Sequence, residues 1–113
     1  MNCEKLLLVN QDDFLQAIAT SQIVTGDFVI DQGTQNLMDR DYIEVVFKNC
    51  SIHGGQFVSS VFQGCTFDDV LFEESALVGV SFVDCTFTLC RMVRMQTSFS
   101  MKNSTIKQLN LVH

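Results

Sequence analysis

A five-residue step through the central part of the chain limits its fold more than any other feature. Every fifth residue there is large and apolar, and these positions are Phe47, Ile52, Phe57, Phe62, Phe67, Phe72, Leu77, Phe82, Phe87 and Met92. The residue two places before each of them is small, which gives a second series of Val45, Cys50, Gly55, Ser60, Cys65, Val70, Ser75, Val80, Cys85 and Cys90. An amphipathic helix repeats about every 3.6 residues and a half-buried strand about every 2, so neither explains a step of five.

A chain that turns a corner every five residues explains both series. Each short side then places one large and one small side chain inward, and four sides make a square coil of twenty residues. Two matching segments support this length, because "FQGCTF" at 62–67 and "FVDCTF" at 82–87 begin twenty residues apart. In a stack of such coils the two segments would lie about 4.8 Å apart, the spacing of paired strands.

The five-residue units also resemble a known family. Units such as "CTFDD", "SALVG", "VSFVD", "CTFTL" and "CSIHG" are similar to those of pentapeptide-repeat proteins, and the resemblance runs unbroken over residues 45–94. Cys, Val or Ser stands here where that family usually has Ala, and Ser, Thr or an apolar residue where it usually has Asp or Asn. The resemblance implies an all-β fold, a right-handed quadrilateral β-helix, of about four coils in a chain of this length.

The chain on either side of the repeat is less regular. Residues 1–20 are predicted to form an N-terminal cap, with a short strand at 5–9 and a helix at 11–20. A cap is expected because a solenoid would otherwise expose its apolar interior and an unpaired backbone edge. Residues 21–113 then form the solenoid, which is most regular over 45–94.

Large apolar residues continue the pattern in both flanks. Upstream, Leu37 and Tyr42 keep the same register. Ile23 and Phe28 share a register that is offset by one residue, which predicts an irregular first coil. Downstream, the step resumes after a gap of nine residues from Met92, at Met101, Ile106 and Leu111.

The length and net charge of the chain limit the classes of function that we expect. The chain of 113 residues fits one domain, and no apolar run approaches the roughly 18 residues of a membrane-spanning helix. No secretory signal is evident either, so we expect a cytoplasmic protein with reduced thiols and no membrane partner. The net charge of −6 disfavours direct binding to nucleic-acid phosphates, but it permits a basic partner or one that normally binds DNA.

Reactive side chains are few, and most of them fall in structural positions. The small inward series contains Cys50, Cys65, Cys85 and Cys90. A thiol in such a position acts as a compact apolar group. Cys65 and Cys85 should be neighbours in adjacent coils, yet no converging set of four ligands accompanies them, as zinc would require. His53 is expected to point outward. We therefore expect no catalytic, cofactor-binding or metal-binding residues, no cofactor and no enzyme activity.

Binding is expected on the outward side chains, where two surfaces stand out. The first is an acidic face formed by Asp68, Asp69, Glu73, Glu74 and Asp84. The simplest interpretation of this face is that it keeps the protein soluble. Arg91 and Arg94, one coil above Leu71 and Glu74, should pair with part of its charge. The second is an apolar strip formed by Val58, Val61, Ala76, Val78 and Val83. An exposed apolar strip often marks an interface.

These features favour a non-catalytic protein–protein interaction module with a rigid surface. One version is an immunity or antitoxin-type protein that neutralises a partner, and a second copy of the chain is another expected occupant of the apolar strip. The alternative follows from the resemblance, because some pentapeptide-repeat proteins mimic duplex DNA and act on type II topoisomerases such as gyrase. Four coils span only about 20 Å, which is short for such a mimic.

Overall fold

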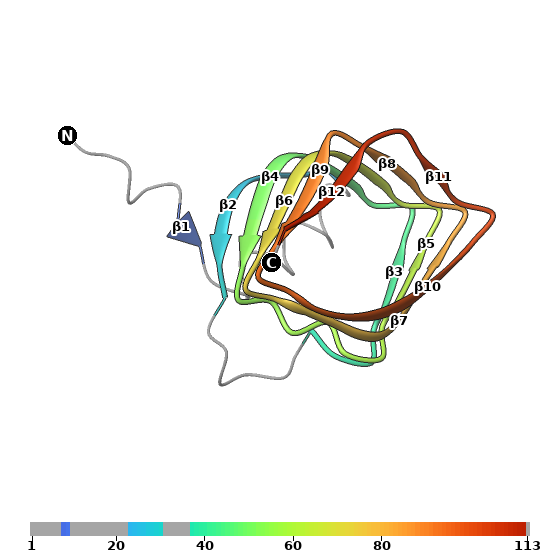
Figure 1. Ribbon diagram of the computed structural model, residues 1–113, viewed down its shortest axis with the longest axis horizontal. Helices are drawn as coiled ribbons and strands as arrows, with labels where there is room; N and C mark the ends of the chain where they lie inside the picture. Colours follow the sequence, from blue (N-terminus) through green and yellow to red (C-terminus); the bar gives the residue numbers. More distant parts are fainter. Residues whose placement is uncertain (1–7, 10–22, 31–36, 113) are drawn as a thin grey trace.

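The computed structural model describes residues 8–9, 23–30 and 37–112, and over these ranges the chain is a β-solenoid of about four turns (Figure 1). Its strands are β1 (Leu8–Val9), β2 (Ile23–Val29), β3 (Asp41–Ile43), β4 (Val46–His53), β5 (Val61–Gln63), β6 (Thr66–Glu73), β7 (Ala76–Val83), β8 (Thr86–Thr88), β9 (Cys90–Val93), β10 (Gln96–Lys102), β11 (Thr105–Ile106) and β12 (Leu109–Val112). The predicted all-β solenoid is confirmed.

Parallel pairing between successive turns builds two sheets. One sheet has the strand order β1-β2-β4-β6-β8-β11, with β9 paired to β6 and β12 paired to β9. The other has the order β10-β7-β5-β3. Between β4 and β6 the register pairs Val46 with Thr66 and Phe47 with Phe67, so one turn takes twenty residues, as expected from the repeat.

Both predicted inward series are buried, and their aromatic members form ladders through the interior. The rings of Phe47, Phe67 and Phe87 stack with centroid separations of 4.8 and 4.7 Å. A second ladder has separations of 4.6 and 5.2 Å and consists of Tyr42, Phe62 and Phe82. Offset or edge contacts of this kind add to the free energy gained by burial. The interior is therefore a continuous apolar stack along the solenoid axis.

A corner in the left-handed backbone region explains the five-residue step. From Asp39 to Arg94 every fifth residue has a φ between 49° and 83°. Glycine occupies this region freely, but most of these corners carry other residue types, at a cost of about 1 kcal/mol or more each. The corner amides are satisfied by the next turn: Ser59 N donates to Val78 O at 2.9 Å, and Glu74 N donates to Val93 O at 3.0 Å.

The first described turn is irregular, as expected, but not in the way that was predicted. Phe28 is buried, whereas Ile23 is 55% exposed, so the shared inward register of these two residues is wrong. The register between β2 and β4 shifts between Val24 and Gly26, and Val24 rather than Ile23 pairs with Phe47 in the core. The shift ends at Gly26, which has a φ of 110°, and across it β2 is one residue shorter than β4.

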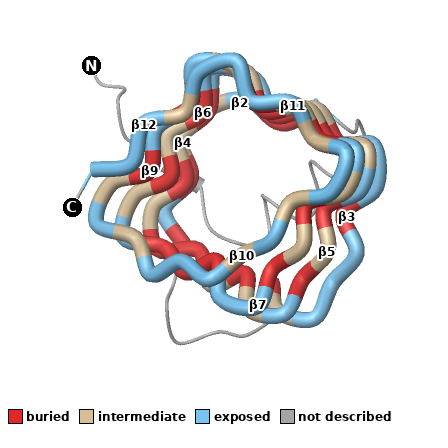
Figure 2. The backbone as a smooth tube through the Cα atoms, turned by 45° about the vertical axis from the view of Figure 1, so that its right-hand side comes forward, coloured by how far each residue is buried: buried red, intermediate tan, exposed pale blue. Residues whose placement is uncertain are grey.

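The last turn resumes the predicted register after it skips one residue relative to the turn below. Met101, Ile106 and Leu111 pair with Phe82, Phe87 and Met92, so the step does resume at these positions. The gap of nine arises because Thr97 pairs with Leu77 and the register then shifts between Ser98 and Phe99. Ile106 and Leu111 are nevertheless 49% and 57% exposed, because no described strand covers this turn, which is mostly pale blue in Figure 2.

The N-terminal cap is the part of the prediction that the structure addresses least. Strand β1 pairs in parallel with β2, with Leu8 opposite Asp27, which is the described part of the strand predicted at 5–9. The helix predicted at 11–20 lies outside the described residues.

Candidate interaction surfaces

The described cysteines serve the interior, as predicted. Cys50, Cys65, Cys85 and Cys90 are buried and free. The thiols of Cys65 and Cys85 donate to the backbone carbonyls of Tyr42 and Phe62, each at 3.2 Å. Burial raises the pKa of Cys50 to about 12, and an interaction with Cys85 together with burial raises that of Cys65. The same interaction lowers the pKa of Cys85 to about 7. Cys50 and Cys65 therefore resist deprotonation and are poor nucleophiles.

A metal centre is likewise not formed by the residues that the structure describes. They contain no group of three or more His, Cys, Asp or Glu side chains able to hold an ion. His53 is half-buried and points outward, as expected, towards the carboxylates of Glu73 and Glu74.

Two of the five residues of the predicted acidic face, Glu73 and Glu74, lie in a small ion-pair network. Arg94 lies one turn above Glu74, and its Nε is 3.1 Å from Glu74 Oε2 while its Nη2 contacts Glu73 Oε2. His53, one turn below, has its Nε2 3.1 Å from Glu74 Oε1. The predicted pairing of Arg94 with this charge is confirmed. These groups are well exposed, so the pairs contribute little to stability.

The other acidic residues of this face lack an ion-pair partner among the described residues. Asp68, Asp69 and Asp84 make no ion pair with any described residue, although Lys48 stands beside Asp68 in the register of β4 and β6. Asp69 and Asp84 are exposed corner residues with φ values of 58° and 55°. The remaining negative surface is thus narrower than the sequence suggested.

The predicted apolar strip is interrupted. Val58 and Val78 occupy equivalent places in successive turns, since Val78 O accepts a hydrogen bond from the amide after Val58. Val61 stacks on Ser81 and Val83 on Gln63, so these valines have polar neighbours. Ala76 is only 2% exposed and was wrongly placed on the surface. It pairs with Gln56 below and Gln96 above, and its single methyl group lies close to the backbone between these longer residues.

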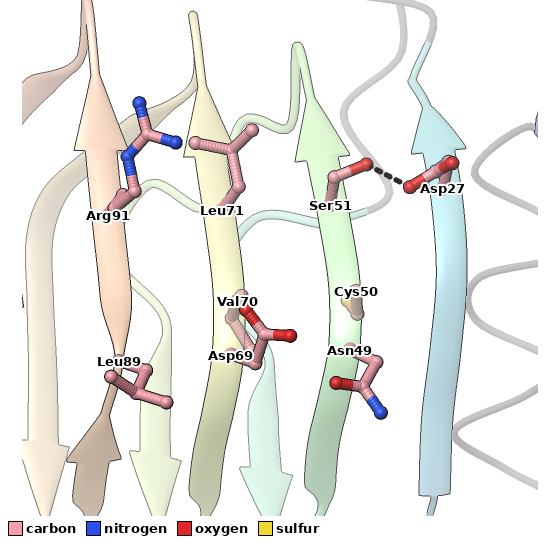
Figure 3. Close-up of a pocket in the computed structure, with 9 residues that line it drawn as sticks. All are labelled: Asp27, Asn49, Cys50, Ser51, Asp69, Val70, Leu71, Leu89 and Arg91. Carbon is pink, nitrogen blue, oxygen red and sulfur yellow. Dashed lines mark hydrogen bonds between the residues drawn. The ribbon is translucent and has the colours of Figure 1, made fainter.

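A groove that the sequence reasoning missed runs across β2, β4, β6 and β9 (Figure 3). One row across it consists of Asp27, Ser51, Leu71 and Arg91, which are register partners in four successive turns. A second row lies at the corner positions and consists of Asn49, Asp69 and Leu89. The groove therefore has the carboxylate of Asp27 at one end, the guanidinium of Arg91 beside Leu89 at the other, and Leu71 and Asp69 in the turn before Arg91.

The polar groups of the groove are unevenly satisfied. Ser51 Oγ donates to Asp27 Oδ1 at 2.6 Å, which fixes this end. Arg91 and Asp69 make no ion pair with the described residues. Arg91 lies three strand spacings from Asp27, about 14 Å. The twenty-residue period was the signal that would have found this groove, because it stacks Ser51 under Leu71 and Arg91.

Comparisons with known proteins leave the chain without an assigned family. No family model matches its sequence, and no curated protein matches it significantly. The described residues also contain no helix that is long and apolar enough to span a membrane.

Proposed function

We propose that the chain is a non-catalytic cytoplasmic interaction module of pentapeptide-repeat type, and that the groove across β2, β4, β6 and β9 binds a segment of a protein partner. Leu89 is the observation that carries this proposal. It is 52% exposed and adopts a φ of 55°, a backbone region that bulky residues rarely occupy. A residue that costs stability while half of its surface stays exposed is best explained by a binding role.

Two further features of the groove support a protein partner. Leu71 and Leu89 offer apolar contact, while Asp69, in the turn of Leu71, and Arg91, in the turn of Leu89, offer charges of opposite sign that are unpaired among the described residues. Apolar contact with a polar rim is the usual arrangement of a protein interface. The opposite charges would fix the direction in which a segment lies. An immunity or antitoxin-type role, in which the chain occludes a toxic partner, is the version that we propose to test first.

The test is affinity capture from the native cell with three variants. Leu89→Asn and Arg91→Glu change the groove, whereas Ile43→Asn changes a residue of equal exposure, 52%, on β3. We expect one partner to be lost with both groove variants and retained with Ile43→Asn, with all three proteins folded by circular dichroism. Retention of every partner by the groove variants would remove the groove as the binding surface.

A second candidate is a DNA mimic that binds a type II topoisomerase. The carboxylates of Asp68, Asp69 and Asp84, which are unpaired among the described residues, favour it, whereas the pairing of Glu73 and Glu74 with Arg94 weakens it. A supercoiling assay with purified gyrase separates the two candidates. Inhibition or protection that disappears in Asp68→Asn/Asp69→Asn supports the mimic, and the absence of any effect at micromolar protein excludes it.

A homodimer through Val58 and Val78 is the remaining proposal about partners. Val78 is exposed and Val58 is half-buried directly below it. Sedimentation of the wild type and of Val78→Asp tests it, and a monomer at all concentrations would exclude it.

A further inference from the structure

The terminal turn, residues 95–112, presents an open edge. Strands β10, β11 and β12 each pair with only one described strand, namely β7, β8 and β9. Their outer N–H and C=O groups therefore face away from the stack, and Figure 2 shows this turn mostly pale blue above turns with red inner positions. An unpaired strand edge is a ready template for another strand.

Apolar side chains of the interior continue into this edge. Within β10, Phe99 and Met101 are half-buried and pack against the core, and they alternate with the exposed Ser98 and Ser100. A strand laid on β10 would thus meet an alternating apolar and polar edge seven residues long. This is the pattern used when an extended segment adds to a sheet.

The same edge contains a vacancy for one side chain. Thr97 stands above Leu77 in the series that is otherwise large and apolar. A small hollow results, lined by Met92, Met95, Thr97, Leu111 and Val112. An apolar side chain from a strand above β10 would fill the place that the series leaves empty at Thr97.

The charged side chains in the last part of the chain are all basic. No acidic residue follows Asp84, whereas the basic residues after it are Arg91, Arg94, Lys102 and Lys107. Arg94 is paired with Glu73 and Glu74, but Lys102 and Lys107 in the terminal turn make no ion pair with described residues. Lys102 ends β10 on its outward side, in register with Val83. A second copy that met this edge with its own terminal turn would bring the same cations to the contact, whereas an acidic segment would match them.

We propose that the terminal turn binds an acidic, extended polypeptide segment by strand addition along β10. The segment pairs its backbone with the free edge of Gln96–Lys102, places an apolar side chain in the hollow at Thr97, and aligns a carboxylate with Lys102. This site lies outside the groove proposed above and does not depend on it.

The test uses capped nine-residue peptides with alternating valine and serine, N-methylated along one edge so that they cannot stack on themselves. One series carries Glu at the position facing Lys102, a second carries Lys there and a third carries Gln. Binding to the purified 113-residue chain is measured by fluorescence anisotropy. We expect the Glu peptide to bind about fivefold more tightly than the Lys peptide at low salt, with Gln between them.

Variants assign the contact to β10. Thr97→Leu fills the hollow and should weaken the Glu peptide at least fivefold without lowering Tm, and Lys102→Glu should reverse the preference between the Glu and Lys peptides. Ile43→Asn, on the opposite edge strand β3 of the same sheet, should change nothing. Hydrogen exchange should slow at β10 amides on binding.

Three results would overturn the proposal. They are equal binding of the Glu and Lys peptides, no binding of any peptide at millimolar concentration, and self-association of the chain that excludes the peptides. Because the assay needs no native partner, it can fail while the groove experiment succeeds, and the reverse.

Discussion

The inner turns, residues 45–94, and the terminal turn at 95–112 carry comparable five-residue units but differ in how far these are buried. Phe82 is fully buried, whereas Met101, its register partner above, is only half-buried. Phe87 and Ile106 differ in the same way. The repeat therefore determines which side chains point inward, and the presence of a covering turn determines whether they leave water.

The largest difference should follow from truncating one side chain in each turn. Phe67→Ala removes a ring that stacks on both Phe47 and Phe87, and it should lower the free energy of unfolding by about 3–5 kcal/mol. Ile106→Ala should cost less than about 1 kcal/mol, because half of this side chain is already in water. Urea unfolding of the two variants measures the contrast, and equal losses would contradict it.

Enlarging a side chain should destabilise an inner turn but not the terminal turn. A Cβ on Gly55 would lie 2.5 Å from Cε2 of Phe57 and 3.1 Å from Cγ2 of Ile52, so Gly55→Ala should destabilise the protein by about 1–3 kcal/mol. In the terminal turn Thr97→Leu enters a hollow and should leave stability unchanged or raise it by up to about 1 kcal/mol. Thermal unfolding shows both, and a lower Tm for Thr97→Leu would mean that the hollow is already filled.

High pH should destabilise the inner turns through the buried thiol of Cys50. Burial raises the pKa of Cys50 to about 12, whereas an unfolded thiol titrates near 8.5. The stabilisation is therefore complete below about pH 8.5 and is lost towards pH 12, at up to about 1.4 kcal/mol per pH unit for each such thiol. Ser104 stands over Cys85 in the terminal turn and does not titrate.

Urea unfolding of the reduced protein at pH 8, 9 and 10 tests this. Cys50→Ala should show a shallower loss than the wild type between pH 9 and 10. An identical slope in the two proteins would show that other groups control the alkaline limit.

Replacing Leu89 should show how much stability a bulky residue costs at a corner with positive φ. Leu89 has a φ of 55°, and the terminal turn has Asn103 at a φ of 52°. Asparagine tolerates this region better than leucine, so Leu89→Asn should stabilise the fold by about 0.5–1 kcal/mol. Leu71→Asn, in an ordinary strand position beside it, is the control and should give no gain. A loss of stability in Leu89→Asn would mean that the leucine packs usefully in the free protein.

The smallest change in the free energy of unfolding is expected when charged side chains are replaced. Arg94→Ala removes two exposed ion pairs and should cost about 0.5 kcal/mol at low salt and nothing at 1 M salt. Lys102→Ala, in the terminal turn, removes no ion pair and should be neutral throughout. Urea titrations at two salt concentrations measure both. A salt-independent loss in Arg94→Ala would point to packing of its alkyl chain instead.

The fold followed from the sequence because the interior repeats. The coupling of a large residue to a small one, as in Phe67 and Cys65, persists from residue 45 to 92, so one register accounts for every buried position in that range except Gly54 and Ala76. Where the period changes, prediction failed: Ile23 was assigned inward because nothing in its letters reveals that β2 is one residue short at Gly26.

The outer surface was predicted less well because the residue types at outward positions do not repeat from turn to turn. Ala76 follows the outward pattern but is hidden between two glutamines, and the valines around it do not join into one strip. The pairing of Arg94 with Glu74 was found because the twenty-residue period placed them together. Leu89 was missed because its importance lies in its backbone angle, which the letters alone do not show.

The two register shifts bear on how such a chain can change length in evolution. They lie between Val24 and Gly26 and between Ser98 and Phe99, in the first and last described turns. A deletion in an inner turn would misalign its corners with neighbours on both sides, whereas one in an outer turn disturbs a single neighbour. Single-residue insertions and deletions should therefore accumulate at the two ends, and the middle should lengthen only by whole turns of twenty residues.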